Sequence, residues 1–380
     1  MLSARKGGLQ TLLDQFFESL TGQIGRAVTK SALSQARKKL KASVFEALNE
    51  RLLGSLAAHA PEPRWRGWRL VAADSTTLRL PNWLENQEAF GVQWDNHGQS
   101  YVLARALGLF TTASKLMVKS AIGRYQDGER ALLVQLLPHL AQDDLLVVDR
   151  GFPAVWLFAY LTQLGRSFLA RIDGANWPEV QSLLRSGRHE AVFERRITPH
   201  SCRQARKLGL ELTGKTLAFR LVRVVLPNGR IEVLATSLLD SSAFPANEFA
   251  SLYQARWSIE EAFKLLKQRL LVEQFTGELP ESIRQDFHAK VFTANLAAAL
   301  AAVAHESLPE AKAQRYQPNF AYILENLRNR LFGWLLGQCN AHDILDLLGL
   351  FAETLEQKRP GRKAPRPSNH ASPKPRRAYK

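Results

Sequence analysis

Four polar side chains recur at helical spacing between residues 249 and 272 and could act on a phosphate group. Tyr253, Arg256, Glu260 and Lys267 follow one another at intervals of three, four and seven residues. On an α-helix they would project within an arc of roughly 60°. The carboxylate could bind a metal ion, and the phenol and the two cations could bind phosphate oxygens. The same charges could instead form a solvated face with ion pairs, which is the commoner meaning of such a pattern.

The apolar residues of the same stretch predict a helix over residues 249–272. Glu261 would point about 100° away from Glu260, so we expect it to lie outside the polar stripe. The apolar residues recur at steps of three and four, which is typical of one buried helix face. They are Leu252, Ala255, Ile259, Phe263, Leu266 and Leu270.

Two aspartates follow short apolar runs that are typical of buried strands. Residues 70–73 precede Asp74, and residues 145–148 precede Asp149. A buried carboxylate needs a partner or a metal ion, because an unpaired desolvated charge is unfavourable. The hydroxyl groups of residues 75–77 could satisfy Asp74 structurally. Both aspartates are predicted to lie at the ends of their strands, and sites of open α/β sheets form at the carboxyl ends of strands such as that of Asp149.

Other polar and aromatic residues near these runs are predicted to have structural roles. Asp143 and Asp144 precede the second apolar run and are interpreted as loop charges. His189 and His200 lack metal-ligand spacing and are predicted to lie at the surface. Trp177 is predicted to pack in the core or at a turn.

The composition indicates a folded chain with a polyanionic partner. The chain has 380 residues, enough for two or three domains, and 46% of them are hydrophobic. The formal net charge of +16 favours nucleic acid as the partner. We find no signal-peptide pattern and no apolar run near the ~20 residues of a membrane span. The two cysteines, Cys202 and Cys339, cannot form a disulfide framework or a zinc site unaided, so a cytoplasmic protein without membrane contact is expected.

Periodicity and turn residues predict an α/β chain with helical regions at both ends. The part from residue 63 to residue 172 has the element order βββαβαβ, which predicts a mixed five-stranded sheet with flanking helices. A β-rich insertion then separates this part from the helix at residues 249–272. The predicted limits are 1–62 for a helical N-terminal region that contacts DNA, 63–172 and 248–300 for the two parts of the α/β domain, 173–247 for the insertion, 301–357 for a helical C-terminal region and 358–380 for a disordered basic tail.

The N-terminal region carries a basic cluster on its second predicted helix. Arg37, Lys38, Lys39 and Lys41 lie close to Ser34 in the sequence. A solvated helix face and a contact to the DNA backbone are both compatible with this cluster.

Asp74, Asp149 and Glu260 together predict a metal site if the fold brings them close. Three convergent carboxylates cannot all stay ionised without cations, so a pair of Mg²⁺ ions would explain them. Two such ions roughly 3.5–4 Å apart support in-line displacement at phosphorus. Mn²⁺ is an equally acceptable ion, since both metals accept oxygen ligands.

The residues described above resemble those of the DDE transposases, which have a ribonuclease-H-like core. The order Asp74, Asp149, Glu260 on a βββαβαβ frame followed by an insertion and a helix is similar to that family's. The pattern Tyr-x2-Arg-x3-Glu-x6-Lys at residues 253–267 resembles the YREK signature of the insertion-sequence transposases of family-four type. The sequences ADSTT, VVDRGF and ATSLLD are similar to flanking motifs of that group.

The resemblance implies roles for these residues. Asp74, Asp149 and Glu260 would be the catalytic metal ligands, and Tyr253 and two cations, Arg256 and Lys267, would hold phosphates at the cleaved transposon end. Members of the family commonly act as dimers that bridge two ends. Some use a tryptophan of the insertion to hold a flipped base in a hairpin route, and no tryptophan lies between Trp177 and Trp257 to carry that role here.

The resemblance therefore implies a cut-and-paste DNA transposase that nicks DNA with metal ions and joins the freed 3′-hydroxyl to target DNA. It further implies a bacterial protein associated with the nucleoid, and a homodimer in the synaptic complex. A nuclease with the same core that only hydrolyses DNA, and an inactive relative that only binds DNA, are the alternatives.

Overall fold

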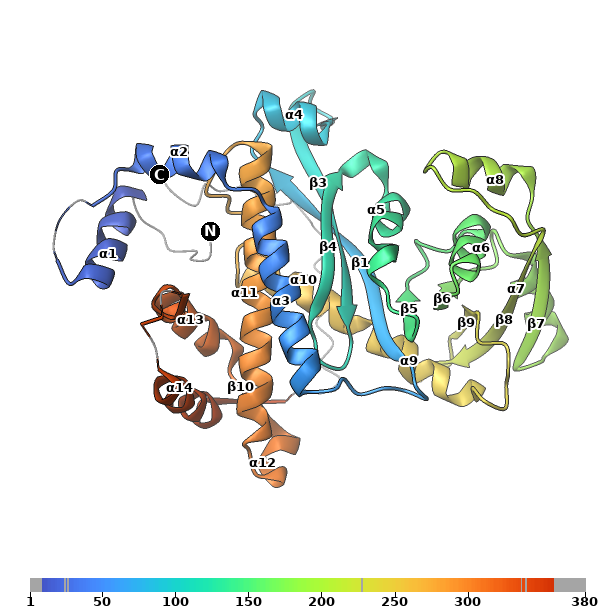
Figure 1. Cartoon of the computed structure of the whole chain (residues 1–380). Helices are drawn as coiled ribbons and strands as arrows, with labels where there is room; N and C mark the ends of the chain where they lie inside the picture. The colour runs from blue at the N-terminus through green and yellow to red at the C-terminus, as the bar shows by residue number, and fades with distance from the viewer. Residues whose placement is uncertain are drawn as a thin grey trace. The chain divides into compact units, whose positions relative to one another are not determined.

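The computed structural model describes residues 9–358, with the exception of residues 24, 26, 227, 336 and 339 (Figure 1). It divides into two compact units. The first contains Met1–Ala60, Leu78–Ala104 and Lys264–Lys380, and the second contains Pro61–Thr77 and Arg105–Phe263. The domain limits given above remain predictions, and the predicted basic tail lies, except for Lys358, outside the described residues.

The second unit contains a mixed sheet whose central strands are parallel. β1 pairs in parallel with β5, and β5 pairs in parallel with β6. The strands in the order β4-β3-β1-β5-β6 form the mixed five-stranded sheet that was predicted for this part of the chain. The strands are β1 (Arg69–Leu80), β3 (Ser100–Thr111), β4 (Met117–Arg124), β5 (Asp144–Val148) and β6 (Ser167–Ile172), of which β1 and β3 also include residues of the first unit.

The insertion extends this sheet instead of forming a separate one. β9 pairs antiparallel with β6, and β8 and β7 follow, so that the described residues form a sheet of nine strands once β2, paired with β3, is included. Helices also occur in the insertion, for which only strands were predicted. The elements are β2 (Val92–Trp94), α7 (Pro178–Ser186), β7 (Glu190–Arg196), α8 (Pro199–Arg206), β8 (Thr216–Val225) and β9 (Ile231–Thr236).

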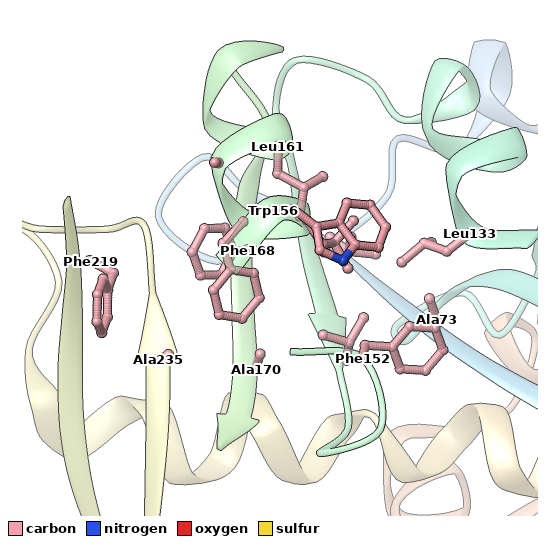
Figure 2. Close-up of a cluster of buried hydrophobic side chains, with 14 of the residues drawn as sticks. Ala73, Leu133, Phe152, Trp156, Leu161, Phe168, Ala170, Phe219 and Ala235 are labelled. Carbon is pink, nitrogen blue, oxygen red and sulfur yellow. The ribbon is translucent and has the colours of Figure 1, made fainter. Parts of the chain in front are cut away.

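Helices cover both faces of the sheet in the second unit. Leu146 and Val148 of β5 belong to a hydrophobic cluster with α5, α6, α7 and α8, and Figure 2 shows Trp156 of α6 in this cluster. Leu145 and Val147 belong to another cluster, with α9, because successive side chains of a strand point to opposite faces. The remaining elements of this unit are η1 (Tyr125–Asp127), α5 (Glu129–Leu136), η2 (Leu137–His139), α6 (Val155–Gln163), η3 (Ala246–Glu248), α9 (Phe249–Ala255) and α10 (Trp257–Gln268), which continues into the first unit.

The first unit is helical and is built around α11, which packs against α3, α13 and α14. Within the described ranges, α11 is long and apolar enough to cross a membrane by length and composition, a property that the sequence patterns did not predict. Of its most apolar stretch, 61% is buried inside the structure, as in the core helix of a folded protein. The elements are α1 (Leu9–Thr21), α2 (Lys30–Lys39), α3 (Ser43–His59), α4 (Leu84–Phe90), α11 (Pro280–Glu306), α12 (Glu310–Arg315), β10 (Tyr316–Pro318), α13 (Phe320–Leu335), α14 (Ala341–Glu353) and β11 (Leu355–Gln357).

Arg37 of α2 is packed inside the first unit and does not belong to a free basic face. Its Nε donates to the side-chain oxygen of Gln285 at 2.7 Å, and its Nη2 lies 3.0 Å from a carboxylate oxygen of Asp286. Arg37 therefore fits neither of the two interpretations left open for the basic cluster, a solvated helix face and a contact to the DNA backbone. Lys38 and Lys39 of the same cluster are exposed, which is compatible with both interpretations.

A buried ion pair joins the first residues of β1 and β5. Arg69 pairs with Asp144 in the strand register, and its Nε and Nη2 donate to the two carboxylate oxygens at 2.6 and 2.8 Å. Asp144 is 1% exposed, so its interpretation as a loop charge is wrong. Asp143 is exposed, as predicted, and lies 2.6 Å from Arg64.

We expect Asp144→Ala to lower the free energy of unfolding by about 3 kcal/mol or more, because it leaves the partly buried Arg69 without its main partner. Asp143→Ala, which removes an exposed ion pair at the neighbouring position, should lower it by less than about 1 kcal/mol. Urea denaturation of the two variants measures both values. Equal effects would contradict the role assigned to the buried pair.

Candidate active site

The register of β1 and β5 brings Asp74 next to Asp149. Ala73 pairs with Val148 in the parallel ladder, and the two aspartates are the next residues on each chain segment. Neighbouring strands lie about 4.7–4.9 Å apart, so the two side chains start from adjacent positions. β1 itself continues to Leu80, so Asp74 lies within a strand, and the prediction that it ends one is wrong.

Main-chain donors orient both aspartates. The N–H of Ser75 donates to Oδ1 of Asp74 at 2.7 Å, and the N–H of Gly151 donates to Oδ1 of Asp149 at 2.9 Å. Hydrogen bonds to a charged carboxylate are stronger than neutral ones and fix its orientation. Each carboxylate is thus held by the backbone that follows it closely in the chain.

The helix predicted over residues 249–272 consists of α9 and α10, which meet at Arg256. The N–H of Arg256 donates to the carbonyl oxygen of Tyr253 at 3.2 Å, and the N–H of Ile259 donates to that of Arg256 at 3.1 Å. These bonds span three residues and form the tighter turn of a 3₁₀-helix. The prediction of one continuous helix is therefore wrong, and α10 ends at Gln268.

Arg256 joins two of the three predicted acids. Its Nη1 donates to Oδ2 of Asp74 at 3.1 Å, and its Nη2 donates to Oε1 of Glu260 at 2.7 Å. The Arg256 side chain is only 7% exposed, and its guanidinium carbon lies 5.7 Å from the ring centre of Tyr253. Its buried Nε has no hydrogen-bond partner in the described structure, so one donor of the guanidinium is left over.

The electrostatics of these groups show that the acids act on one another. Burial raises the pKa of Asp74 to about 6; the cation of Arg256 opposes this rise, and the charges of Asp149 and Glu260 add to it. Burial also raises the pKa of Tyr253. Burial lowers the pKa of Arg256, but Tyr253 and the two carboxylates raise it more, so the net shift is upward.

The structure thus brings Asp74, Glu260, Arg256 and Tyr253 together and places Asp149 close enough to influence both Asp74 and Tyr253. Among the described residues, no three His, Cys, Asp or Glu side chains converge as ligands of one ion. One oxygen of Asp74 and one of Glu260 instead accept from the guanidinium of Arg256.

Two further charged residues of the same stretch are Lys267 and Glu261. Lys267 lies in the last turn of α10, in the part that belongs to the first unit. Glu261 is exposed, as expected for a residue outside the polar stripe.

Trp177, His189 and His200 lie where the sequence patterns predicted. Trp177 is 4% exposed and packs in the core beside Phe158 and Phe219, and His189 and His200 are exposed.

The sequence patterns missed Glu129 and Arg105, which lie against Ser75. The Oγ of Ser75 donates to Oε1 of Glu129 at 2.7 Å, and Nη1 of Arg105 donates to the same oxygen at 2.8 Å. The available signal was weak: Glu129 follows Gly128 at the start of a predicted helix, where an acidic residue is common for reasons of helix stability alone.

Comparisons with known proteins match the chain to a family model, a curated relative and a solved structure. The family model described as "Transposase DDE domain" matches residues 65–296. Transposase InsG for insertion sequence element IS4, from Escherichia coli (strain K12), is 26% identical over 275 residues, which cover 71% of this chain and 60% of that protein. A cryo-EM structure of the piggyBac transposase synaptic complex with hairpin DNA aligns with a TM-score of 0.42 and 11% identity, over 78% of this chain and 59% of that chain.

The raised pKa of Asp74 predicts a pH-dependent stability of the metal-free protein. A carboxyl whose pKa is 3.8 when unfolded and about 6 when folded binds its proton more tightly in the folded state, so stability falls as the pH rises through this window. Between about pH 4 and pH 7, the free energy of unfolding of the wild type should fall by about 2 kcal/mol relative to Asp74→Asn, measured by urea denaturation in EDTA. A difference that does not vary with pH would contradict the assignment.

Proposed function

Since the chain belongs to the family of transposase DDE domains, we propose that it is a DNA transposase of an insertion sequence, acting by metal-dependent cleavage and strand transfer. The chain spans 60% of the length of its curated relative, which is named as a transposase of an insertion sequence element. The observation that best supports the proposal is that Arg256 donates hydrogen bonds to two carboxylates at once. One belongs to Asp74 of the sheet strand β1, and the other belongs to Glu260 of helix α10.

The donor set suits a divalent metal ion in its chemistry. Asp74, Asp149 and Glu260 offer only carboxylate oxygens, which Mg²⁺ and Mn²⁺ prefer, and their net charge exceeds what Arg256 can neutralise. Family membership supports a divalent ion; a pair of Mg²⁺ ions held by these three residues is our proposal. When bound, such ions would activate the attacking hydroxyl group and stabilise the leaving oxygen.

The chain's own residues would bind and orient the DNA phosphate. A phosphate offers Arg256 the paired acceptor oxygens that its guanidinium now finds on two carboxylates, and its unpaired Nε–H adds a third donor. The hydroxyl of Tyr253 and the ammonium of Lys267 would supply a neutral donor and a point charge. These contacts would hold the cleaved end in line for attack.

The charge of the whole chain supports DNA as the partner. A formal net charge of +16 favours binding to a polyanion and makes the affinity dependent on salt. We propose that transposon ends and target DNA are the substrates, that two copies of the chain form the synaptic complex, and that the protein acts in the cytoplasm at the nucleoid.

We expect Asp74→Ala, Asp149→Ala and Glu260→Ala each to abolish DNA cleavage while DNA binding is retained. The test incubates each variant with Mg²⁺ and a duplex that contains the terminal repeat of the element encoding the chain. Nicked, hairpinned or joined products from the wild type would identify the cleavage mechanism. Joined products would distinguish a transposase from a nuclease that only hydrolyses DNA. Uncut DNA with the wild type would overturn the proposed function.

Glu261→Ala is the matched control for Glu260→Ala, because it removes an adjacent, exposed carboxylate from the same helix. Its cleavage rate should stay near that of the wild type. An inactive Glu261→Ala beside an active Glu260→Ala would reverse our choice between the two residues.

Lys267→Ala should weaken binding to the transposon end and reduce the salt dependence of that binding. Removal of one cation that binds a phosphate lowers the slope of log K against log salt concentration by about 0.9. Binding titrations at several salt concentrations measure this slope. An unchanged slope would exclude Lys267 as a phosphate ligand.

A further inference from the structure

We propose that the first two residues of α5, Glu129 and Arg130, are positioning residues that hold Asp74 and Asp149 in place for catalysis. The inference rests on the proposed function for the role of the two aspartates. It arises from contacts that α5 makes with both acid-bearing segments, neither of which is adjacent to α5 in the sequence. Glu129 contacts the segment after Asp74, and Arg130 contacts the segment after Asp149.

Glu129 is linked to Asp74 through Ser75. The side chain of Ser75 donates to Oε1 of Glu129 at 2.7 Å, while its main-chain N–H donates to Oδ1 of Asp74 at 2.7 Å. Arg105 donates from Nη1 to the same Glu129 oxygen at 2.8 Å and to the Ser75 hydroxyl at 3.2 Å. A charged acceptor shared by two donors fixes Ser75, and Ser75 in turn fixes the direction of the Asp74 carboxylate.

Arg130 is linked to Asp149 through the loop that follows it. Its Nε donates to the carbonyl oxygen of Phe152 at 2.8 Å, and its Nη2 donates to those of Gly151 at 2.8 Å and Pro153 at 3.1 Å. A rigid guanidinium that meets three successive carbonyl groups leaves the loop little freedom. The N–H of Gly151, which orients Asp149, belongs to this loop.

Gly151 lies close to the carboxylates of both Glu129 and Asp149. A Cβ atom at Gly151 would lie 3.0 Å from Oε2 of Glu129 and 3.1 Å from Oδ1 of Asp149. The carboxylates of Glu129 and Asp149 therefore both border this glycine, and the position leaves no free room for a side chain. Glu129 thus reaches the surroundings of both aspartates, through Ser75 on one side and Gly151 on the other.

This geometry differs from that of an ordinary surface ion pair. The pair of Glu129 with Arg105 is partly buried, with 30% and 15% of the side chains exposed, and one of its oxygens also accepts from Ser75. Partners that orient metal-binding side chains typically contribute about 10–100-fold to metal affinity or activity. An ion pair with a purely structural role would change stability without changing the metal affinity of the folded protein.

The experiment measures two properties of the full chain for Glu129→Ala and Arg130→Ala. The first is the affinity for Mn²⁺ without DNA, by electron paramagnetic resonance of the free ion. The second is hydrogen exchange in EDTA of the peptides that contain residues 74–77 and 149–153. The conservative variants Glu129→Gln and Arg130→Lys are included because each keeps part of the hydrogen bonding and preserves the fold.

Glu179→Ala is the matched control. Glu179 also lies in the first turn of a helix, α7, in the same unit, and it pairs with Arg195 at 3.1 Å. Its removal should leave Mn²⁺ affinity and the exchange of both acid-bearing peptides unchanged.

We expect Glu129→Ala and Arg130→Ala to weaken Mn²⁺ binding by about tenfold or more. Exchange should be about fivefold faster in the 74–77 peptide for Glu129→Ala and in the 149–153 peptide for Arg130→Ala, which is the effect of removing one hydrogen bond. Glu129→Gln, which keeps an acceptor oxygen for Ser75, should retain more of the wild-type affinity than Glu129→Ala.

Unchanged Mn²⁺ affinity in both alanine variants would overturn the inference, whether or not exchange changes, because the residues would then be structural only. An equal loss in Glu179→Ala would also overturn it. If the wild type binds Mn²⁺ only when the terminal-repeat duplex is present, the affinities of all variants are compared in its presence. A wild type that binds no Mn²⁺ with or without the duplex would overturn the proposed function instead, and the exchange of the two peptides would then decide whether Glu129 and Arg130 hold them.

Discussion

The ion pairs of Arg256 with Asp74 and Glu260 are the interaction on which the rest of the site depends. One almost fully buried guanidinium meets a carboxylate of the sheet and a carboxylate of α10. Without this cation, burial and the neighbouring carboxylates would raise the pKa of Asp74 further. Even with it, the pKa of Asp74 is raised to about 6, so the arginine compensates only in part. Two carboxylates on one guanidinium, with Asp149 close enough to raise the pKa of Asp74 further, are the charge arrangement on which the proposed binding of a further cation rests.

The positions of the two aspartates depend on a strand register that is fixed at the far end of the same strands. The buried pair of Arg69 and Asp144 occupies the first position of the ladder, and Ala73 and Val148 occupy the last. A slip by one residue would separate the buried charges and turn alternate side chains to the opposite face. Because β5 is apolar on both faces, its hydrophobic contacts alone distinguish the correct register poorly. The ion pair therefore contributes to the accuracy of the site as well as to stability.

The sequence predicted those parts of the fold and of the site that follow from local periodicity. The apolar runs before Asp74 and Asp149 located both central strands, and the spacing of three and four located the polar side of α9 and α10. The sequence could not reveal that Asp144 is buried, because its partner Arg69 is distant in the chain. The sequence offered only a weak indication of Glu129, because its contacts arise only when α5 meets the end of the β1–β5 ladder. The break between α9 and α10 was missed because the tighter turn leaves the apolar spacing unchanged.

Under the proposed function, a metal ion and Arg256 compete for the same oxygens of Asp74 and Glu260. A buried guanidinium cannot leave these acceptors without others, because an unpaired buried charge is strongly unfavourable. A DNA phosphate supplies such acceptors in the paired geometry that a guanidinium prefers, and the unpaired Nε–H of Arg256 is a further donor to it. DNA that takes Arg256 would thus free two carboxylates for the ion, and an ion that takes the carboxylates would free Arg256 for DNA. By thermodynamic linkage the two effects are equal in size, so the bridge couples binding of the substrate to binding of the metal.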